Sequence, residues 1–318
     1  MRVRPGRRGS RPRTKRRPEH ADAVPAMVVA VDRGRWTCAV GGDPRLRVTA
    51  MRARELGRTP VVVGDRVGLV GDVLDRPDQL ARIVRVEERS SVLRRTADDT
   101  DPYERIVVAN AEQLLIVASL ADPPPRTGLI DRCLVAGYAG GLEPVLCLTK
   151  RDLAAPDAVL ERYAALDLPV LVVSPDAGVD EVRARLAGHV SVLVGHSGVG
   201  KSTLVNRLVP DADRTTAAVS GVGKGRHTST SAVALALAGG GWVVDTPGIR
   251  SFGLAHVIPD DVVRAFGDLA AAIADCPRGC THLGPPADPE CALDDLAGAA
   301  HRRAMSVRAL LTALNESG

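Results

Sequence analysis

Gly195-His196-Ser197-Gly198-Val199-Gly200-Lys201-Ser202 predicts a phosphate-binding loop, because it matches the pattern GxxxxGK followed by Ser or Thr. The apolar run 190–194 precedes it, and residues 203–208, which have a helical pattern, follow it. Strand, glycine-rich loop and helix in this order are the context that such a loop requires. The glycines let backbone N–H groups turn toward phosphate oxygens, and the helix N-terminus adds partial positive charge.

Two side chains of this loop have specific expected roles. Lys201 is expected to reach the β- and γ-phosphates of a nucleotide, and the Ser202 hydroxyl is expected to ligate Mg²⁺. The other nucleotide-binding residues expected here are Gly195, His196, Ser197, Gly198, Val199, Gly200 and Thr203.

A second motif, Thr149-Lys150-Arg151-Asp152, predicts which base is bound. It directly follows the apolar run 145–148, so it is expected at the end of a strand. A carboxylate at Asp152 can accept hydrogen bonds from both N1–H and N2–H₂ of guanine, a donor pair that adenine lacks. A buried polar group left unpaired costs about 1–3 kcal/mol, so this site favours GTP and GDP over ATP.

Three further residues are expected around the base. Thr149 belongs to the base-reading motif, and the stem of Lys150 is expected to cover the base face. Ser174 follows the next apolar run, 170–173, and its backbone is expected to contact guanine O6.

Asp245-Thr246-Pro247-Gly248 has the form DxxG and follows the apolar run 242–244. Asp245 is expected to hold Mg²⁺ through a water molecule, and the Gly248 N–H is expected to contact the γ-phosphate. The Gly-rich, basic segment 221–230 (GVGKGRHTST) lies between this motif and the phosphate loop. It is typical of a switch that orders around the γ-phosphate, with Thr228 or Thr230 reaching Mg²⁺.

Ile249 stands where many GTPases have a glutamine that orients the attacking water. An isoleucine cannot do this, so intrinsic hydrolysis is expected to be slow unless His227 or a partner supplies the missing group. A solvated or RNA-facing His227 is the alternative interpretation.

The order of the motifs indicates a circularly permuted G domain. In an ordinary G domain the phosphate loop comes first and the base-reading motif comes late, whereas here the base-reading motif precedes the phosphate loop, the switch and DxxG. The site forms where the carboxyl ends of parallel strands meet, so it depends on spatial order and tolerates moved chain ends. DxxG then lies next to the C-terminal region, into which we expect the γ-phosphate state to be transmitted.

Cys276-x₃-Cys280-x-His282-x₈-Cys291 predicts a zinc site. Three thiolates and one imidazole complete a tetrahedral Zn²⁺ shell, and a closed four-ligand set is structural rather than catalytic. Scattered loop cysteines are the alternative. Cys38, Cys133 and Cys147 lie in apolar patterns and are expected in the core.

Composition restricts the remaining function classes. The chain of 318 residues has a formal net charge of +4, and no apolar stretch approaches the ~18 residues of a membrane span. Six cysteines in this length do not indicate a disulfide scaffold, so a reducing, cytoplasmic location is expected. Arg and Lys crowd positions 1–17, with no carboxylate before Glu19. This indicates a phosphate-neutralising arm, with a solubilising disordered tail or an organelle transit peptide as alternatives.

The pattern along the chain predicts four regions. They are a basic tail (1–22), a small β-barrel (23–95), a permuted α/β domain (96–256) and a helical zinc domain (257–318). The barrel strands are expected at 26–31, 36–40, 45–50, 60–63, 67–70 and 81–86, which fits an oligonucleotide-binding (OB) barrel or an SH3-like barrel. In the α/β domain strands are expected at 114–120, 145–148, 170–173, 190–194, 232–237 and 242–244, with helices at 129–139, 156–166 and 179–187. A final helix is expected over 293–314.

Taken together, these motifs resemble the ribosome small-subunit-dependent GTPase A (RsgA, or YjeQ) family. Further matching segments are Gly64-Asp65-Arg66-Val67, Val108-Ala109-Asn110 with Gln113, Leu129-Ile130-Asp131-Arg132, Gly225-Arg226-His227-Thr228 and Ile249-Arg250 with Phe252-Gly253-Leu254. The resemblance implies an OB barrel, a permuted G domain and a zinc-binding helical domain. It also implies GTP hydrolysis stimulated by the small ribosomal subunit, binding to its rRNA, and a role in late subunit maturation.

Some positions differ from the family pattern. Ser229 stands within the usual run of three threonines, and Thr149 stands where Asn is common. The first zinc spacing is one residue shorter and the last three residues longer than the common C-x₄-C-x-H-x₅-C, which affects the expected geometry at Cys291.

Two rival functions stay open at this point. One is a permuted GTPase of the large ribosomal subunit, although such proteins generally lack both the preceding barrel and the zinc knuckle. The other is an RNA-binding scaffold with slow or structural nucleotide binding, which the missing glutamine favours. The expected protein is a monomer with no membrane partner.

Overall fold

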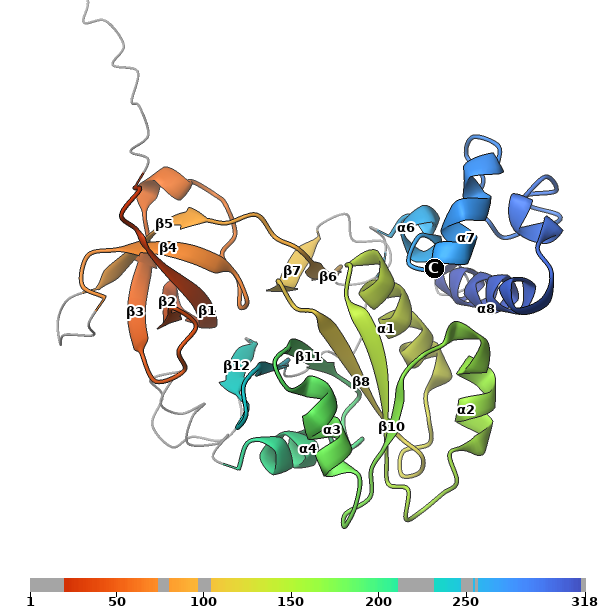
Figure 1. The fold of residues 1–318 in the computed structure, drawn as a ribbon, viewed down its shortest axis with the longest axis horizontal. Helices are drawn as coiled ribbons and strands as arrows, with labels where there is room; N and C mark the ends of the chain where they lie inside the picture. The colour runs from red at the N-terminus through yellow and green to blue at the C-terminus, as the bar shows by residue number, and fades with distance from the viewer. Residues whose placement is uncertain are drawn as a thin grey trace, which may run out of the picture.

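The computed structural model describes residues 20–73, 80–96, 104–210, 232–246, 254 and 257–315. These residues form an N-terminal barrel, a central sheet flanked by helices, and a helical C-terminal unit (Figure 1). No helix in these ranges is both long and apolar enough to span a bilayer.

The N-terminal strands close into a barrel of the OB type. Its strands are β1 (Val24–Asp32), β2 (Arg35–Val40), β3 (Arg47–Arg52), β4 (Arg66–Val70) and β5 (Ala81–Val86). They are hydrogen-bonded in the order β1-β2-β3-β5-β4, and β1 also pairs with β4. The β3–β5 pair is parallel. This closed five-stranded order is that of the OB fold, so the SH3-like alternative is excluded.

The strand predicted over residues 60–63 is wrong. A 3-10 turn, η1 (Arg54–Leu56), precedes this stretch, and Val63 forms an isolated bridge to Val108. Its other polar groups bind side chains: Trp36 Nε1 donates to Val61 O at 2.9 Å, and Val62 N donates to Asp65 Oδ2 at 2.8 Å. Because side chains satisfy these groups, the segment does not need a barrel ladder.

The central sheet contains the apolar runs predicted from the sequence. Its strands have the order β10-β9-β8-β11-β13-β12, and β12 is antiparallel to β13 while the other neighbours are parallel. Every residue of β8 is buried, as expected for a parallel strand covered on both faces. The strands are β8 (Gln113–Ser119), β9 (Glu143–Thr149), β10 (Val170–Val172), β11 (Val190–Val194), β12 (Val233–Ala236) and β13 (Trp242–Asp245).

Helices cover both faces of this sheet, and alternate strand residues face each side. On one side, α1 (Thr127–Ala139) and α2 (Asp157–Tyr163) share a core with the C-terminal helices. On the other side, α3 (Val179–Leu186) and α4 (Lys201–Leu208) form a second core. The turn η2 (Ala164–Leu166) follows α2.

A hairpin that the sequence did not predict joins the barrel to the sheet. It consists of β6 (Val92–Arg95) and β7 (Arg105–Ala109), which pair antiparallel and lie between β5 and β8 in the chain (Figure 1). The hairpin spans the predicted division between residues 95 and 96, and the predicted domain limits stay predictions.

The C-terminal unit is helical and packs on α1. It contains α6 (Pro259–Val263), α7 (Gly267–Ala272), η3 (Ile273–Asp275), η4 (Ala292–Asp295) and α8 (Gly298–Asn315). The rings of Tyr138 and Phe266 lie 4.7 Å apart, and Arg303 of α8 bonds to Asp268 at 2.6 Å and contacts Asp167. The single helix predicted over 293–314 is wrong at its start, because Leu296 is extended and the helix begins only at Gly298.

Candidate nucleotide site and metal centre

The predicted phosphate loop joins β11 to α4, at the carboxyl edge of the sheet. Its conformation depends on glycine: Gly198 has φ 84° and Gly200, the residue before α4, has φ 90°. Gly195 lies so close to β8 that a Cβ there would be 2.5 Å from Val117 O. A side chain at any of these positions would strain the loop.

Lys201 and Asp245 form an ion pair across the loop, although they come from α4 and β13. Both side chains are largely shielded, with 12% and 28% of their surface exposed. The structure thus brings together the two residues predicted to serve the phosphates and Mg²⁺. Ser202 and Thr203, in the first turn of α4, are exposed.

The base-reading motif is bonded to the phosphate loop. Thr149, at the end of β9, is buried, and its hydroxyl donates to Val199 O at 2.6 Å. Lys150 has φ 59°, and its ammonium group donates to Asp122 O in the loop after β8. Asp152 follows in an exposed turn. The threonine hydroxyl thus ties the end of β9 to the phosphate loop.

Two further contacts tie the loops together. Arg207, near the end of α4, donates through Nη1 to Ser174 O at 2.7 Å. Thr246, next to Asp245, donates from its hydroxyl to Leu193 O of β11 at 2.6 Å. Within the phosphate loop itself, His196 Nδ1 lies 2.8 Å from Ser197 O.

Four predicted residues lie outside the described part of the chain. These are the switch residues His227, Thr228 and Thr230, and Gly248 of the DxxG motif.

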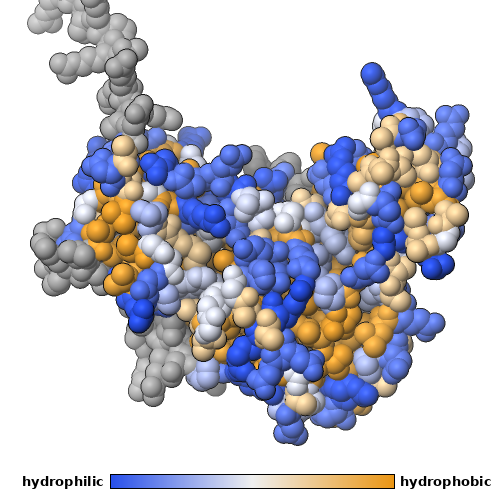
Figure 2. Space-filling view, in the orientation of Figure 1, coloured by the Kyte–Doolittle hydropathy of each residue, from blue (hydrophilic) through white to orange (hydrophobic). Residues whose placement is uncertain are grey.

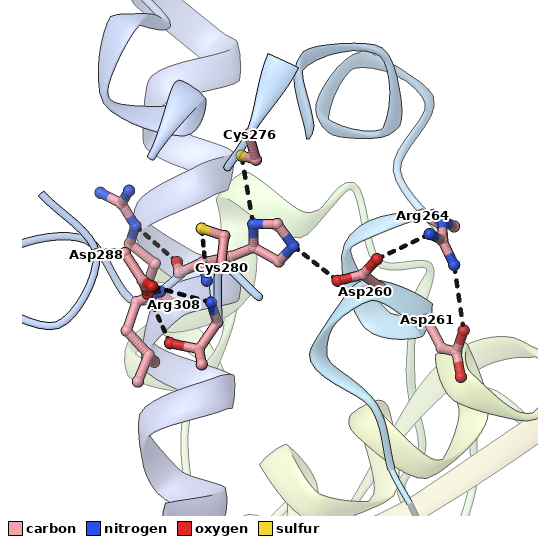
Figure 3. A network of polar contacts seen from close by, with 10 residues as sticks. Asp260, Asp261, Arg264, Cys276, Cys280, Asp288 and Arg308 are labelled. Atoms are coloured by element: carbon pink, nitrogen blue, oxygen red, sulfur yellow. Dashed lines mark hydrogen bonds and ion pairs between the residues drawn. The ribbon is translucent and has the colours of Figure 1, made fainter. Parts of the chain in front are cut away.

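The four predicted zinc ligands converge in the C-terminal unit. The candidate ligand atoms of Cys276, Cys280, His282 and Cys291 all lie within 4.8 Å of one another. Cys276 Sγ is 3.6 Å from His282 Nδ1 (Figure 3). Three sulfur atoms and one imidazole nitrogen at this spacing fit one tetrahedral Zn²⁺, despite the long spacing before Cys291.

A carboxylate holds the other ring nitrogen of His282. Asp260 Oδ1, on α6, lies 2.9 Å from His282 Nε2, and His282 is almost completely buried (Figure 3). The carboxylate accepts from Nε2–H, which leaves the Nδ1 lone pair for a metal. Arg308 of α8 also donates to His282 O at 3.0 Å. Sequence reasoning missed Asp260, because no spacing motif links it to a ligand 22 residues away.

Burial of the thiols disfavours their charged form. It raises the pKa of Cys280 to about 12, and it raises the pKa of Cys276 as well. A bound divalent cation reverses this preference, because metal-coordinating thiols are deprotonated. The other three cysteines, Cys38, Cys133 and Cys147, are core residues as predicted, and burial raises each pKa to about 12.

Comparison with known proteins gives a consistent result. Residues 86–255 match the family model described as RsgA GTPase. Chlorobaculum parvum has a "Small ribosomal subunit biogenesis GTPase RsgA" that is 34% identical over 279 residues, covering 83% of this chain and 90% of the relative. The protein of the same name from Ectopseudomonas mendocina is 44% identical over 197 residues, 59% of this chain and 56% of its own length.

Solved structures are similar over nearly the whole chain. YjeQ from Thermotoga maritima superposes with a TM-score of 0.64 at 26% identity, covering 91% of this chain and 98% of its own. YloQ, described as a circularly permuted GTPase, has a TM-score of 0.63 at 21% identity, with 94% and 98% covered. The second likeness concerns the fold alone.

Proposed function

The chain belongs to the RsgA GTPase family, and on that premise we propose that it hydrolyses GTP in late maturation of the small ribosomal subunit. The family assignment makes the protein a GTPase with a circularly permuted G domain. The barrel before this domain and the Cys/His cluster behind it count against the large-subunit rival. The names of the relatives support the small subunit as the particle on which the protein acts.

One observation carries the nucleotide-site assignment: four sequence segments that are far apart in the chain are bonded to one another at one sheet edge. Thr149 bonds to Val199, Lys201 pairs with Asp245, and Arg207 bonds to Ser174. Parallel strands present their loops at one edge, which is where ligands of such folds bind. We assign the phosphates of GTP or GDP to the whole 195–203 loop and guanine to Asp152, Lys150 and the Ser174 backbone.

The Lys201–Asp245 pair supports a specific exchange of partners. With nucleotide bound, Lys201 would turn from Asp245 to the phosphates, and Mg²⁺ would be held by Ser202 directly and by Asp245 through a water molecule. Mg²⁺, when bound, neutralises charge that develops on the phosphoryl oxygens. We keep Thr228 or Thr230 as a further magnesium contact, Gly248 as the γ-phosphate contact, and His227 as the residue assisting hydrolysis.

We assign one structural Zn²⁺ to Cys276, Cys280, His282 and Cys291. This closed donor set supports a metal that organises the fold of the C-terminal unit rather than one that takes part in hydrolysis.

We further propose that the barrel and basic residues 1–22 bind rRNA. Exposed arginines are numerous on the barrel, and OB barrels commonly bind oligonucleotides. Figure 2 shows hydrophilic residues along the upper edge between the barrel and the C-terminal unit. We also propose that the protein acts as a monomer in the cytoplasm. The exposed barrel arginines are Arg33, Arg35, Arg45, Arg52, Arg54, Arg58, Arg66, Arg82 and Arg85.

The first test is GTP turnover with purified small ribosomal subunits, large subunits or neither, and with ATP as the base control. The proposal requires slow turnover of GTP alone, a sharp rise with small subunits, and no comparable rise with large subunits. A GTP turnover rate that small subunits do not change would instead favour the scaffold function.

A further inference from the structure

Several polar contacts between the barrel and the segments that lead into the nucleotide domain converge on the Gly64-Asp65 turn. Asp65 is fully buried, and Arg89 donates to both of its carboxylate oxygens, at 2.7 Å (Nε to Oδ1) and 2.9 Å (Nη2 to Oδ2). The same guanidinium donates to Pro60 O at 2.8 Å. A paired arginine and carboxylate of this kind fix direction as well as charge, so the turn has one defined shape.

Asn110 bonds this turn to the nucleotide domain. It lies just after β7 with φ 52°, and its side chain is buried. Its Nδ2 donates to Gly64 O at 3.0 Å, and its Oδ1 accepts from Ser90 N at 2.9 Å. At Gly64 itself a Cβ would lie only 1.9 Å from Ala109 O, so the two backbones are in direct contact. Asn110, which follows β7, therefore joins the turn to the residues just before β6.

An apolar core lies beside these polar contacts. Val29 and Val63 from the barrel side are buried in the same cluster as Leu93 of β6 and Val108 of β7. Val63 also pairs with Val108 through the backbone, and Ala109 N donates to Val63 O at 3.0 Å. These apolar contacts add to the polar ones in holding the barrel against the hairpin.

Strand β1 extends from this junction to the nucleotide site. Gly64 N donates to Val28 O at 2.8 Å, and Val28 N donates to Asp65 O at 2.9 Å. Two residues further along, Ala30 pairs with Val233 of β12, and Val233 pairs with Asp245 of β13. Ala30, Val233 and Asp245 therefore lie in one row across the three strands. Two strand spacings place β1 about 10 Å from Asp245, the partner of Lys201.

We propose that the junction of Asp65, Arg89 and Asn110 couples the barrel energetically to the nucleotide site through β1 and β12. A partner bound at the barrel and a nucleotide bound at Lys201 and Asp245 then change each other's affinity. This inference rests on the proposed function, in which the barrel binds the small ribosomal subunit. Such coupling is reciprocal and typically amounts to about 5- to 150-fold in affinity.

The test compares Asn110→Gly with Glu104→Gln in the full-length protein. The first change removes the bonds to Gly64 and Ser90 while glycine tolerates the positive φ. The second removes an exposed ion pair with Arg94 (3.5 Å) in the same hairpin and retains every basic charge. The affinity of each protein for purified small subunits is measured with GDP and with a non-hydrolysable GTP analogue.

The quantity compared is the affinity for small subunits with the GTP analogue divided by the affinity with GDP. This ratio is expected to be the same, and different from one, in wild type and Glu104→Gln. In Asn110→Gly it is expected to be close to one. The affinity of this variant for GDP without subunits is expected to stay within about 2-fold of wild type, since the junction makes no contact with the described nucleotide-site residues. A full wild-type ratio in Asn110→Gly would overturn the inference.

Hydrogen exchange provides a readout that needs no ribosome. GDP is expected to slow the exchange of β1 amides and of the Gly64 and Asp65 amides in wild type and Glu104→Gln. Asn110→Gly is expected to lose the effect at Gly64 and Asp65. If GDP does not change the exchange of β1 amides in wild type, the coupling does not exist. This measurement uses wild type alone, so it remains valid even when the variant fails to fold. If wild type shows the β1 effect without binding small subunits, the proposed function fails and the coupling survives.

Discussion

The Thr149 hydroxyl donates a hydrogen bond to the Val199 carbonyl at 2.6 Å, and this bond joins the base-reading motif to the phosphate loop. The two residues are 50 positions apart in the chain, Thr149 at the end of β9 and Val199 in the loop that follows β11. Strand β8 lies between these two strands, so the two residues meet above its end. If the two motifs bind guanine and phosphate as proposed, this bond helps to set the spacing between those two sites.

Replacing Thr149 by valine is expected to weaken GDP binding by about 5- to 30-fold, because a lost buried hydrogen bond costs roughly 1–2 kcal/mol. Valine retains the shape of threonine and removes the hydroxyl. Titration calorimetry measures the effect, and Thr149→Ser, which keeps the donor, is expected to bind like wild type. Equal weakening in both variants would show that the methyl group matters instead.

Asp152→Asn is expected to reduce GTP affinity by about 10- to 100-fold, since hydrogen bonds to a charged acceptor contribute about 1.5–3 kcal/mol. Its side-chain amide can donate to the 2-oxo group of xanthine, so xanthosine triphosphate is expected to bind better than GTP. Competition binding with both nucleotides checks this reversal. Asp157→Asn, at the exposed start of α2, serves as the control, and an unchanged base preference in Asp152→Asn would place the guanine contact elsewhere.

Asp260→Asn is expected to lower zinc affinity by about 10- to 100-fold, because outer carboxylates orient ligand imidazoles. The zinc-loaded protein is challenged with a chromophoric chelator, and the rate and extent of zinc release are recorded. The control is Asp261→Asn, the neighbouring residue, which pairs with Arg264 at 3.6 Å and does not contact His282 (Figure 3). If both variants release zinc at the same rate and to the same extent, Asp260 does not support the zinc site through His282.

His227→Ala is expected to lower subunit-stimulated turnover while leaving GDP affinity nearly unchanged. The reason is the isoleucine at position 249, which cannot orient water and leaves that role to another group. Single-turnover hydrolysis with and without small subunits measures the effect. Full stimulation in the variant would remove His227 from the mechanism.

Sequence patterns predicted the central sheet well. They missed β6 and wrongly predicted a strand over residues 60–63, and both errors have a physical reason. Parallel strands are buried on both faces, so runs such as Val190–Val194 are mainly apolar, with Ser191 bonded to Gln113 of β8, and β11 has those bounds. By contrast, β6 contains two arginines in four residues and depends on pairing with β7. The stretch 60–63 looks like a strand, but distant side chains and β7 satisfy its polar groups.

The chemistry of the individual motifs was readable from the chain alone, because glycine conformation, ligand type and short spacings are local properties. A motif of a few residues predicts phosphate binding at Gly200 and Lys201, and another predicts metal binding at Cys276 and Cys280. Only the tertiary structure decided which groups meet: Thr149 with Val199, His282 with Asp260, and Asn110 with Gly64. Those contacts join residues 22 to 50 positions apart, and strand order, helix packing and backbone register, which no local pattern encodes, determine them.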